Sequence, residues 1–302
     1  MTLEQKLKNL DVPKGKIDVV LDTDAYNEID DQFAIAYLLK SKQKLNTKAI
    51  YAAPFLNSRS ISPLDGMEKS YDEILKLLSL LGENVDVFKG SDRFLDDEKT
   101  PVMSEAARDL AKRANDYSPE NPLYIVAIGA ITNVASAFLL NPKMAENTVV
   151  VWLGGHSREY HDTKEFNMYQ DVAASRVVMG SGVPFVQLPC MGVVSAFTLS
   201  KPEIEYWLLS KNSIADYLGR NSIEAAEKYA SGKPWTRCIW DVTAIGWLLN
   251  DDGRFMSSRI VPTYLSSYDN KYCIDNNAQP MRYIYHIHRD TLMDDLIKTV
   301  TK

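Results

Sequence analysis

Four short apolar runs constrain the fold of this chain more than any other feature of its sequence. They are rich in β-branched residues, each leads directly into polar or glycine residues, and they lie at 17–21, 124–128, 149–153 and 184–188. Such runs are typical of parallel strands that helices cover on both faces. Helical patterns separate them, at DQFAIAYLLKS, at MEKSYDEILKLLSLLG ending on Gly82, at SEAARDLAKRA from 104 and at TNVASAFLL from 132. The alternation predicts an α/β fold, a doubly wound and mostly parallel sheet with helices on both faces.

The rest of the chain is expected to belong to the same domain. From about 201 the pattern is mostly helical, with Pro202, Gly232 and Pro234 as breakers, and the last stretch has strand patterns before a final helix, DTLMDDLIKTV. No linker, repeat or low-complexity segment interrupts the sequence. We therefore expect one domain over 1–302, with the helical region at about 201–240 packed at the edge of the sheet.

Composition excludes several classes of function. The chain has 34 basic and 40 acidic residues, and no run of Lys and Arg is dense enough to follow a phosphate backbone, so we expect no nucleic acid partner. Its three cysteines are widely spaced, which indicates no disulfide framework and favours a reducing cytoplasm. No apolar run approaches the roughly 18 residues of a membrane span. The composition predicts a soluble, cytoplasmic protein without a membrane partner.

An acidic segment follows the first apolar run. LDTDAYNEIDDQFAIAYLL places four aspartates and one glutamate within ten residues, between a predicted strand and a predicted helix. Ligands of doubly wound sheets bind beyond the carboxyl ends of the strands. Buried there, Asp22, Asp24, Asp30 and Asp31 would repel one another unless a cation compensated them, and oxygen ligands favour a hard divalent ion. The alternative is that Asp30 and Asp31 cap the following helix.

The acidic segment resembles the opening motif of the inosine-uridine-preferring nucleoside hydrolase family, Asp-x-Asp-Pro-Gly-x-Asp-Asp, although DTDAYNEIDD is two residues longer. Further similar stretches follow in family order, namely VDVFKGSDRFL at 85–95, YIVAIGAITNVASAFLLNP at 124–142, VVVWLGG at 149–155, KEFNMYQDVAAS at 164–175 and WDVTAIGWLL at 240–249. The resemblance covers nearly the whole chain. It implies a nucleoside hydrolase-like fold with a Rossmann-like core, a calcium-dependent hydrolase of the N-glycosidic bond of ribonucleosides, and a homo-oligomer, either a dimer or a tetramer.

The resemblance also implies roles for individual residues. The ligands of Ca²⁺ are expected to be Asp24, Asp31, Asp241 and the backbone carbonyl of Ile128. Asp30 is expected to contact the sugar or the water, and the expected substrate-binding residues are Asn57, Glu165 and Asn167. Each expectation has an alternative, because Asn57 and Asn167 are also common turn residues and Asp241 could cap the helix VTAIGWLL.

These residues support one mechanism. Cleavage of an N-ribosyl bond builds positive charge on the ribose ring, needs a water on the face opposite the base and leaves a poor leaving group. A calcium-bound water is the expected nucleophile, with Asp24 as general base and Asp30 beside it. Two alternatives are a calcium-stabilised module that binds sugars or nucleosides without turnover, and a hydrolase of another N-ribosyl compound.

The sequence departs from the family around the base. Trp240 stands where well-known members have a histidine that can protonate the leaving base, so we expect it to bind the base by stacking; the alternative is a core aromatic. Tyr169 and Trp235 could stack similarly. The shorter loop after Gly155 contains His156, Arg158 and His161, which could face the base or the 5′ end, and Cys190 is expected to be a small buried hydrophobe. Purine against pyrimidine preference stays open.

Overall fold

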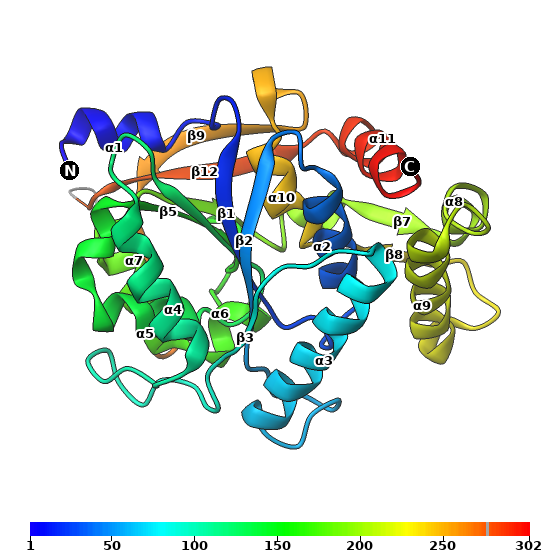
Figure 1. Cartoon of the computed structure of the whole chain (residues 1–302), viewed down its shortest axis with the longest axis horizontal. Coiled ribbons are helices and arrows are strands. Elements are labelled where there is room, and N and C mark those ends of the chain that lie inside the picture. The colour runs from blue at the N-terminus through cyan, green and yellow to red at the C-terminus, as the bar shows by residue number, and fades with distance from the viewer. Residues whose placement is uncertain (276–277) are drawn as a thin grey trace.

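An eight-stranded sheet forms the centre of the computed structural model, which describes residues 1–275 and 278–302 (Figure 1). Its strand order is β3-β2-β1-β4-β5-β6-β12-β9, and all neighbours run parallel except β9, which pairs antiparallel with β12 at one edge. The predicted doubly wound, mostly parallel sheet is confirmed. Its strands are β1 (Ile17–Thr23), β2 (Leu45–Ala52), β3 (Val87–Lys89), β4 (Leu123–Ala127), β5 (Thr148–Leu153), β6 (Phe185–Leu188), β9 (Met256–Pro262) and β12 (Pro280–Ile287).

Helices cover both faces of the sheet, as its side chains require. In β4, Leu123, Ile125 and Ala127 pack into one core while Tyr124 and Val126 pack into the other. Successive side chains of a strand point to opposite faces of the sheet. Because both faces are buried, consecutive residues must be apolar, which explains the continuous apolar runs. The first face is covered by α4 (Glu105–Arg113), α5 (Thr132–Leu140) and α7 (Val172–Gly180), and the second by α2 (Asp30–Lys40), α3 (Pro63–Leu81), α10 (Val242–Leu248) and α11 (Arg289–Val300) (Figure 1).

The remaining elements lie around this core. Two antiparallel pairs are formed by β7 (Thr198–Ser200) with β8 (Thr236–Cys238), and by β10 (Tyr264–Ser266) with β11 (Tyr272–Ile274). The other helices are α1 (Leu3–Asn9), α6 (Phe166–Gln170), α8 (Lys201–Trp207) and α9 (Ser213–Ala230), and α9 contacts α2, α3 and α8. Across residues 1–275 and 278–302, no helix combines the length and the apolar character that a membrane crossing needs.

The predicted elements correspond to β1, β4, β5 and β6 and to α2, α3, α4 and α5. Gly82 caps α3 in the left-handed region, with a φ of 66°, where glycine is favoured. Two strands at the far edge are not predicted by the apolar runs. The first half of β2 is only partly buried and carries polar residues, and β3 has three residues.

The strand order indicates where the sheet can bind a ligand. The strand β1 lies between β2 and β4. The chain first adds β2 and β3 on one side of β1, and it later adds β4, β5 and β6 on the other side. Such a switch point opens a crevice at the carboxyl ends of the strands. The acidic segment after β1 and the residues that follow β4, β5 and β6 all meet at this edge.

Candidate active site

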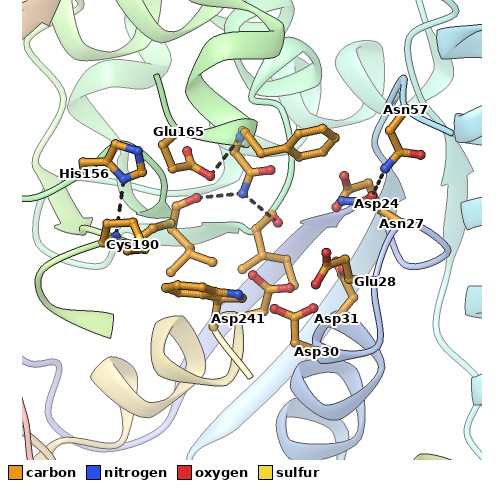
Figure 2. Close-up of a pocket in the computed structure, with 16 residues that line it drawn as sticks. Asp24, Asn27, Glu28, Asp30, Asp31, Asn57, His156, Glu165, Cys190 and Asp241 are labelled. Atoms are coloured by element: carbon orange, nitrogen blue, oxygen red, sulfur yellow. Dashed lines mark hydrogen bonds between the residues drawn. The ribbon is translucent and has the colours of Figure 1, made fainter. Parts of the chain in front are cut away.

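A cavity of about 290 Å³ lies at the carboxyl edge of the sheet (Figure 2). Every residue that the sequence predicts as a calcium ligand, a catalytic residue or a substrate-binding residue lines it, whereas Asp22 of the acidic segment does not. Other lining residues are not predicted, namely Asn27, Glu28, Leu153, Phe166 and Met191, and His156 and Cys190 also line it. The lining residues from the predicted set are Asp24, Asp30, Asp31, Asn57, Ile128, Glu165, Asn167, Trp240 and Asp241.

Three carboxylates converge at the base of the cavity. Asp30 and Asp31 lie in the first turn of α2, Asp241 precedes α10, and each offers an oxygen within 4.8 Å of the others. The Thr23 hydroxyl donates a hydrogen bond to Asp31. Asp241 occupies the N-cap position of α10, but its side chain makes no capping hydrogen bond. The carboxylates are therefore directed at one another and at the cavity.

Burial dominates the protonation chemistry of this cluster. Burial raises the pKa of Asp31 to about 7. It also raises the pKa values of Asp24 and Asp241 well above their ordinary range, and the negative charges of the neighbouring carboxylates raise these two pKa values further. One oxygen of Asp24, Oδ2, is buried without a hydrogen-bond partner. A hard cation with oxygen ligands fits this set, because it would compensate the repulsion and give the unpartnered oxygen a ligand.

Asp22 lies behind the cluster. Its Oδ1 accepts a hydrogen bond of 2.8 Å from Asn133 Nδ2, while its Oδ2 is buried without a partner. Burial raises the pKa of this carboxyl to about 7, against the lowering effect of Asn133. Asp22 does not line the cavity, but its negative charge contributes to the raised pKa of Asp24.

Asn167 ties two strand ends together at the cavity wall. Its Nδ2 donates to the carbonyl oxygens of Ile128 at 3.2 Å and of Leu153 at 3.0 Å. Ile128 follows β4, and Leu153 ends β5. The side chain therefore fixes the position of the carbonyl that the sequence predicts as a ligand.

Glu165 holds the short helix α6 beside Asn167. Its carboxylate accepts hydrogen bonds from the backbone N–H groups of Asn167 at 3.0 Å, Met168 at 3.0 Å and Gly155 at 2.8 Å. Cys190 contacts the same carboxylate, and burial raises its own thiol pKa well above the ordinary value. The thiol is thus a buried group rather than a nucleophile.

The acidic segment contributes two unpredicted residues to the cavity. Asn27 Oδ1 accepts a hydrogen bond of 2.6 Å from Asn57 Nδ2, and Glu28 pairs with Arg237 at 2.8 Å. Both belong to the stretch in which this chain is two residues longer than the family motif. The only sequence signal for them is that added length between the aspartates.

Trp240 and His156 line another wall of the cavity, and Figure 2 shows His156 on the side away from Asn57. The Nδ1 atom of His156 accepts from Met191 N at 3.3 Å, its ring hydrogen-bonds the backbone of Lys164, and burial lowers its pKa. Trp240 is partly buried and packs on the core as well as lining the cavity.

Four other side chains considered for this wall do not line the cavity. Arg158 packs against the rings of Tyr264 and Tyr283, at 5.6 and 5.7 Å. His161 pairs with Asp162 at 3.2 Å and is exposed. Tyr169 is half exposed, and Trp235 donates to Glu227.

The fold and the site define an α/β protein with an acidic ligand cavity at the carboxyl edge of its sheet. The family model of the inosine-uridine preferring nucleoside hydrolases matches residues 19–279, so the chain belongs to this family. This confirms the resemblance seen in the sequence and the enzyme class, hydrolysis of the N-glycosidic bond of ribonucleosides.

The sequence identity between this chain and its relatives is low. The non-specific ribonucleoside hydrolase RihC of Salmonella paratyphi B is 26% identical over 270 residues, which cover 79% of this chain and 80% of that protein. A Shigella dysenteriae relative named as a pyrimidine-specific ribonucleoside hydrolase, RihB, is 28% identical over 144 residues, 44% of this chain and 51% of its own length. The structure of a purine-preferring ribonucleoside hydrolase from Gardnerella vaginalis superimposes with a TM-score of 0.74 at 17% identity, covering 94% and 98% of the two chains.

Proposed function

We propose that this enzyme hydrolyses ribonucleosides to ribose and free base with Asp24 as the general base in a calcium-holding site. One observation carries the proposal. Buried carboxylates converge on a cavity at the carboxyl edge of the sheet, and Asp24 Oδ2 has no protein partner there. A cation would compensate the repulsion among these carboxylates, which otherwise favours their protonated forms.

The residues proposed to hold Ca²⁺ are Asp24, Asp31, Asp241 and the carbonyl of Ile128. All four line the cavity, and Asp30 has an oxygen within 4.8 Å of those of Asp31 and Asp241. The hardness of the oxygen ligands supports calcium over zinc. When bound, the ion would act as a Lewis acid that orients ribose hydroxyls and water.

The protein groups supply the remaining chemistry. Asp24 accepts the proton of the attacking water, and Asp30 orients the water or the sugar beside it. Asn57, Glu165 and Asn167 line the part of the cavity proposed to receive the ribose. The negative charge of the buried carboxylates stabilises the positive charge that develops on the ribose ring in the transition state.

The base is proposed to stack on Trp240. An indole offers a large flat face and no useful proton, so stacking replaces the acid that a histidine would supply at this position. The names of the relatives describe non-specific, pyrimidine-specific and purine-preferring enzymes. These preferences differ, and the proposal therefore extends to ribonucleosides as a class.

The test is release of free ribose from a panel of purine and pyrimidine ribonucleosides, with and without a calcium chelator. Wild type is compared with Asp24→Ala and with Asp290→Ala, whose carboxylate is 93% exposed. The proposal predicts chelator-sensitive release that disappears in Asp24→Ala and persists in Asp290→Ala. Binding of ribonucleosides by the calcium-loaded protein without release of ribose would favour a binding module instead.

We also propose a cytoplasmic location and assembly into a homodimer or homotetramer. The three thiols, Cys190, Cys238 and Cys273, are free, which is typical of a reducing compartment. Light scattering of the purified protein measures its oligomeric state directly, and a monomeric mass would refute the assembly.

A further inference from the structure

The cavity is rich in hydrogen-bond acceptors and poor in free donors. Five carboxylates line it besides that of Glu165, and each is an acceptor when ionised. The amide of Asn167 is engaged by two backbone carbonyls, and the Cys190 thiol contacts Glu165. A sugar hydroxyl can donate to a carboxylate, but the side chains of Asn167 and Cys190 leave no free donor for its oxygen.

Asn27 supplies that donor. It is buried, 7% exposed, and it lines the cavity on the side of the acidic segment (Figure 2). Its Oδ1 is occupied by Asn57 Nδ2 at 2.6 Å. Among residues 1–275 and 278–302, its Nδ2 makes no hydrogen bond to a protein acceptor, whereas its Oδ1 accepts one. The two N–H groups of this amide are therefore available to a ligand.

The orientation of the Asn27 amide is fixed by a backbone group. The N–H of Arg59 donates to Asn57 Oδ1 at 2.9 Å, and a backbone N–H can only donate. Asn57 Nδ2 must then be the atom that faces Asn27, and Asn27 Oδ1 must be the atom that receives it. Exchanging oxygen and nitrogen in either amide would place two donors or two acceptors together.

The loop that carries Asn27 is held on both sides. The N–H of Asn27 donates to Asp24 O at 2.7 Å, and the ring of Tyr26 packs under the guanidinium of Arg59 at 4.8 Å. On the other side, Glu28 pairs with Arg237. The donor is therefore positioned before a ligand arrives, which is what a precise substrate contact requires.

We infer that Asn27 is a ribose-binding residue that donates its side-chain amide to a hydroxyl oxygen of the sugar. The inference rests on the proposed function, which places the ribose in the part of the cavity that Asn57 lines. Asn57 is then a positioning residue for Asn27. A chain that lacks the added length of this segment would have no such donor, so the contact would be specific to this variant of the motif.

A substrate-by-protein cycle tests the inference. The inhibition constants of a ribonucleoside and of its 2′-deoxy and 3′-deoxy analogues are measured for wild type, Asn27→Ala and Asn27→Asp, with Asn115→Ala as a control outside the cavity. In wild type, loss of the contacted hydroxyl should weaken binding. The discrimination ratio for a hydroxyl is the inhibition constant of the analogue that lacks it, divided by that of the ribonucleoside. In both Asn27 variants we expect this ratio to fall about 5- to 10-fold for the contacted hydroxyl and to stay unchanged for the other hydroxyl.

The outcomes separate the inference from the proposed function. Unchanged ratios for both hydroxyls would overturn the role of Asn27, even if the variants lost activity, because a purely structural defect weakens all three ligands alike. Failure of wild type to release ribose from any ribonucleoside would refute the proposed function instead. Calorimetric dissociation constants of the same three ligands would then replace the inhibition constants, and the same ratios would decide the role of Asn27.

Discussion

Removal of the cation should make the stability of this protein fall as pH rises. Burial raises the pKa of Asp31 from its ordinary value of 3.8 to about 7. Between these values the folded state binds a proton that the unfolded state has released, so the carboxyl stabilises the fold at low pH and this stabilisation is lost as pH rises towards 7. The difference between the two pKa values of Asp31 corresponds to about 4 kcal/mol in the free energy of unfolding, of which about 3 kcal/mol is lost between pH 5.0 and 8.5.

The assay is urea unfolding of the chelated protein, followed by fluorescence of its five tryptophans, at pH 5.0 and 8.5. The free energy of unfolding should be lower at pH 8.5, and Asp31→Asn should reduce the difference by the part that this carboxyl contributes, while Asp22, Asp24 and Asp241 contribute the rest. Saturating calcium should restore stability at pH 8.5 by mass action. Equal stability at the two pH values in the chelated wild type, or a rise with pH, would refute the reasoning that uncompensated buried carboxylates dominate this site.

Three substitutions test other parts of the site. Asp24→Asn should lower the rate of ribose release at least about 100-fold, because it removes the general base and one proposed calcium ligand, and rates measured at saturating calcium would isolate the loss of the general base. Trp240→Ala should raise the KM of purine ribonucleosides about 5- to 10-fold through lost stacking, which steady-state kinetics would show; an unchanged KM would place the indole outside the base site. Gly129→Ala should lower kcat with little change in melting temperature, because an added Cβ would lie 3.1 Å from Asp24 Oδ1 and displace this carboxylate.

The sequence predicted the sheet well because its central strands are buried on both faces. Their continuous apolar runs are a direct consequence of that burial, as β4 and β5 show. The strand β2, next to the edge strand β3, carries polar residues in its first half and gives a weaker pattern, and β3 itself has only three residues. Short edge elements therefore depend on tertiary contacts that no local pattern records.

The candidate site was predictable where chemistry is concentrated in a motif. The aspartates of the acidic segment stand out because four carboxylates follow one predicted strand, and Glu165 and Asn167 were predicted only through the resemblance to the family. Asn27 does not stand out, because an asparagine in a loop is most often a turn residue. Only the structure shows that Asn27 lines the cavity and that Asn57 and the Arg59 N–H fix which atom of its amide is left without a protein partner.

The most direct test of the central claim is a single NMR experiment on the chelated enzyme with a ribonucleoside, into which calcium is then titrated. The proposed function predicts no product before the titration, followed by equal amounts of free ribose and free base, with the rate saturating at about one calcium ion per chain. Product formation at an undiminished rate in the chelated enzyme would contradict the role of the cation. Intact ribonucleoside in the presence of bound calcium would contradict the proposed reaction.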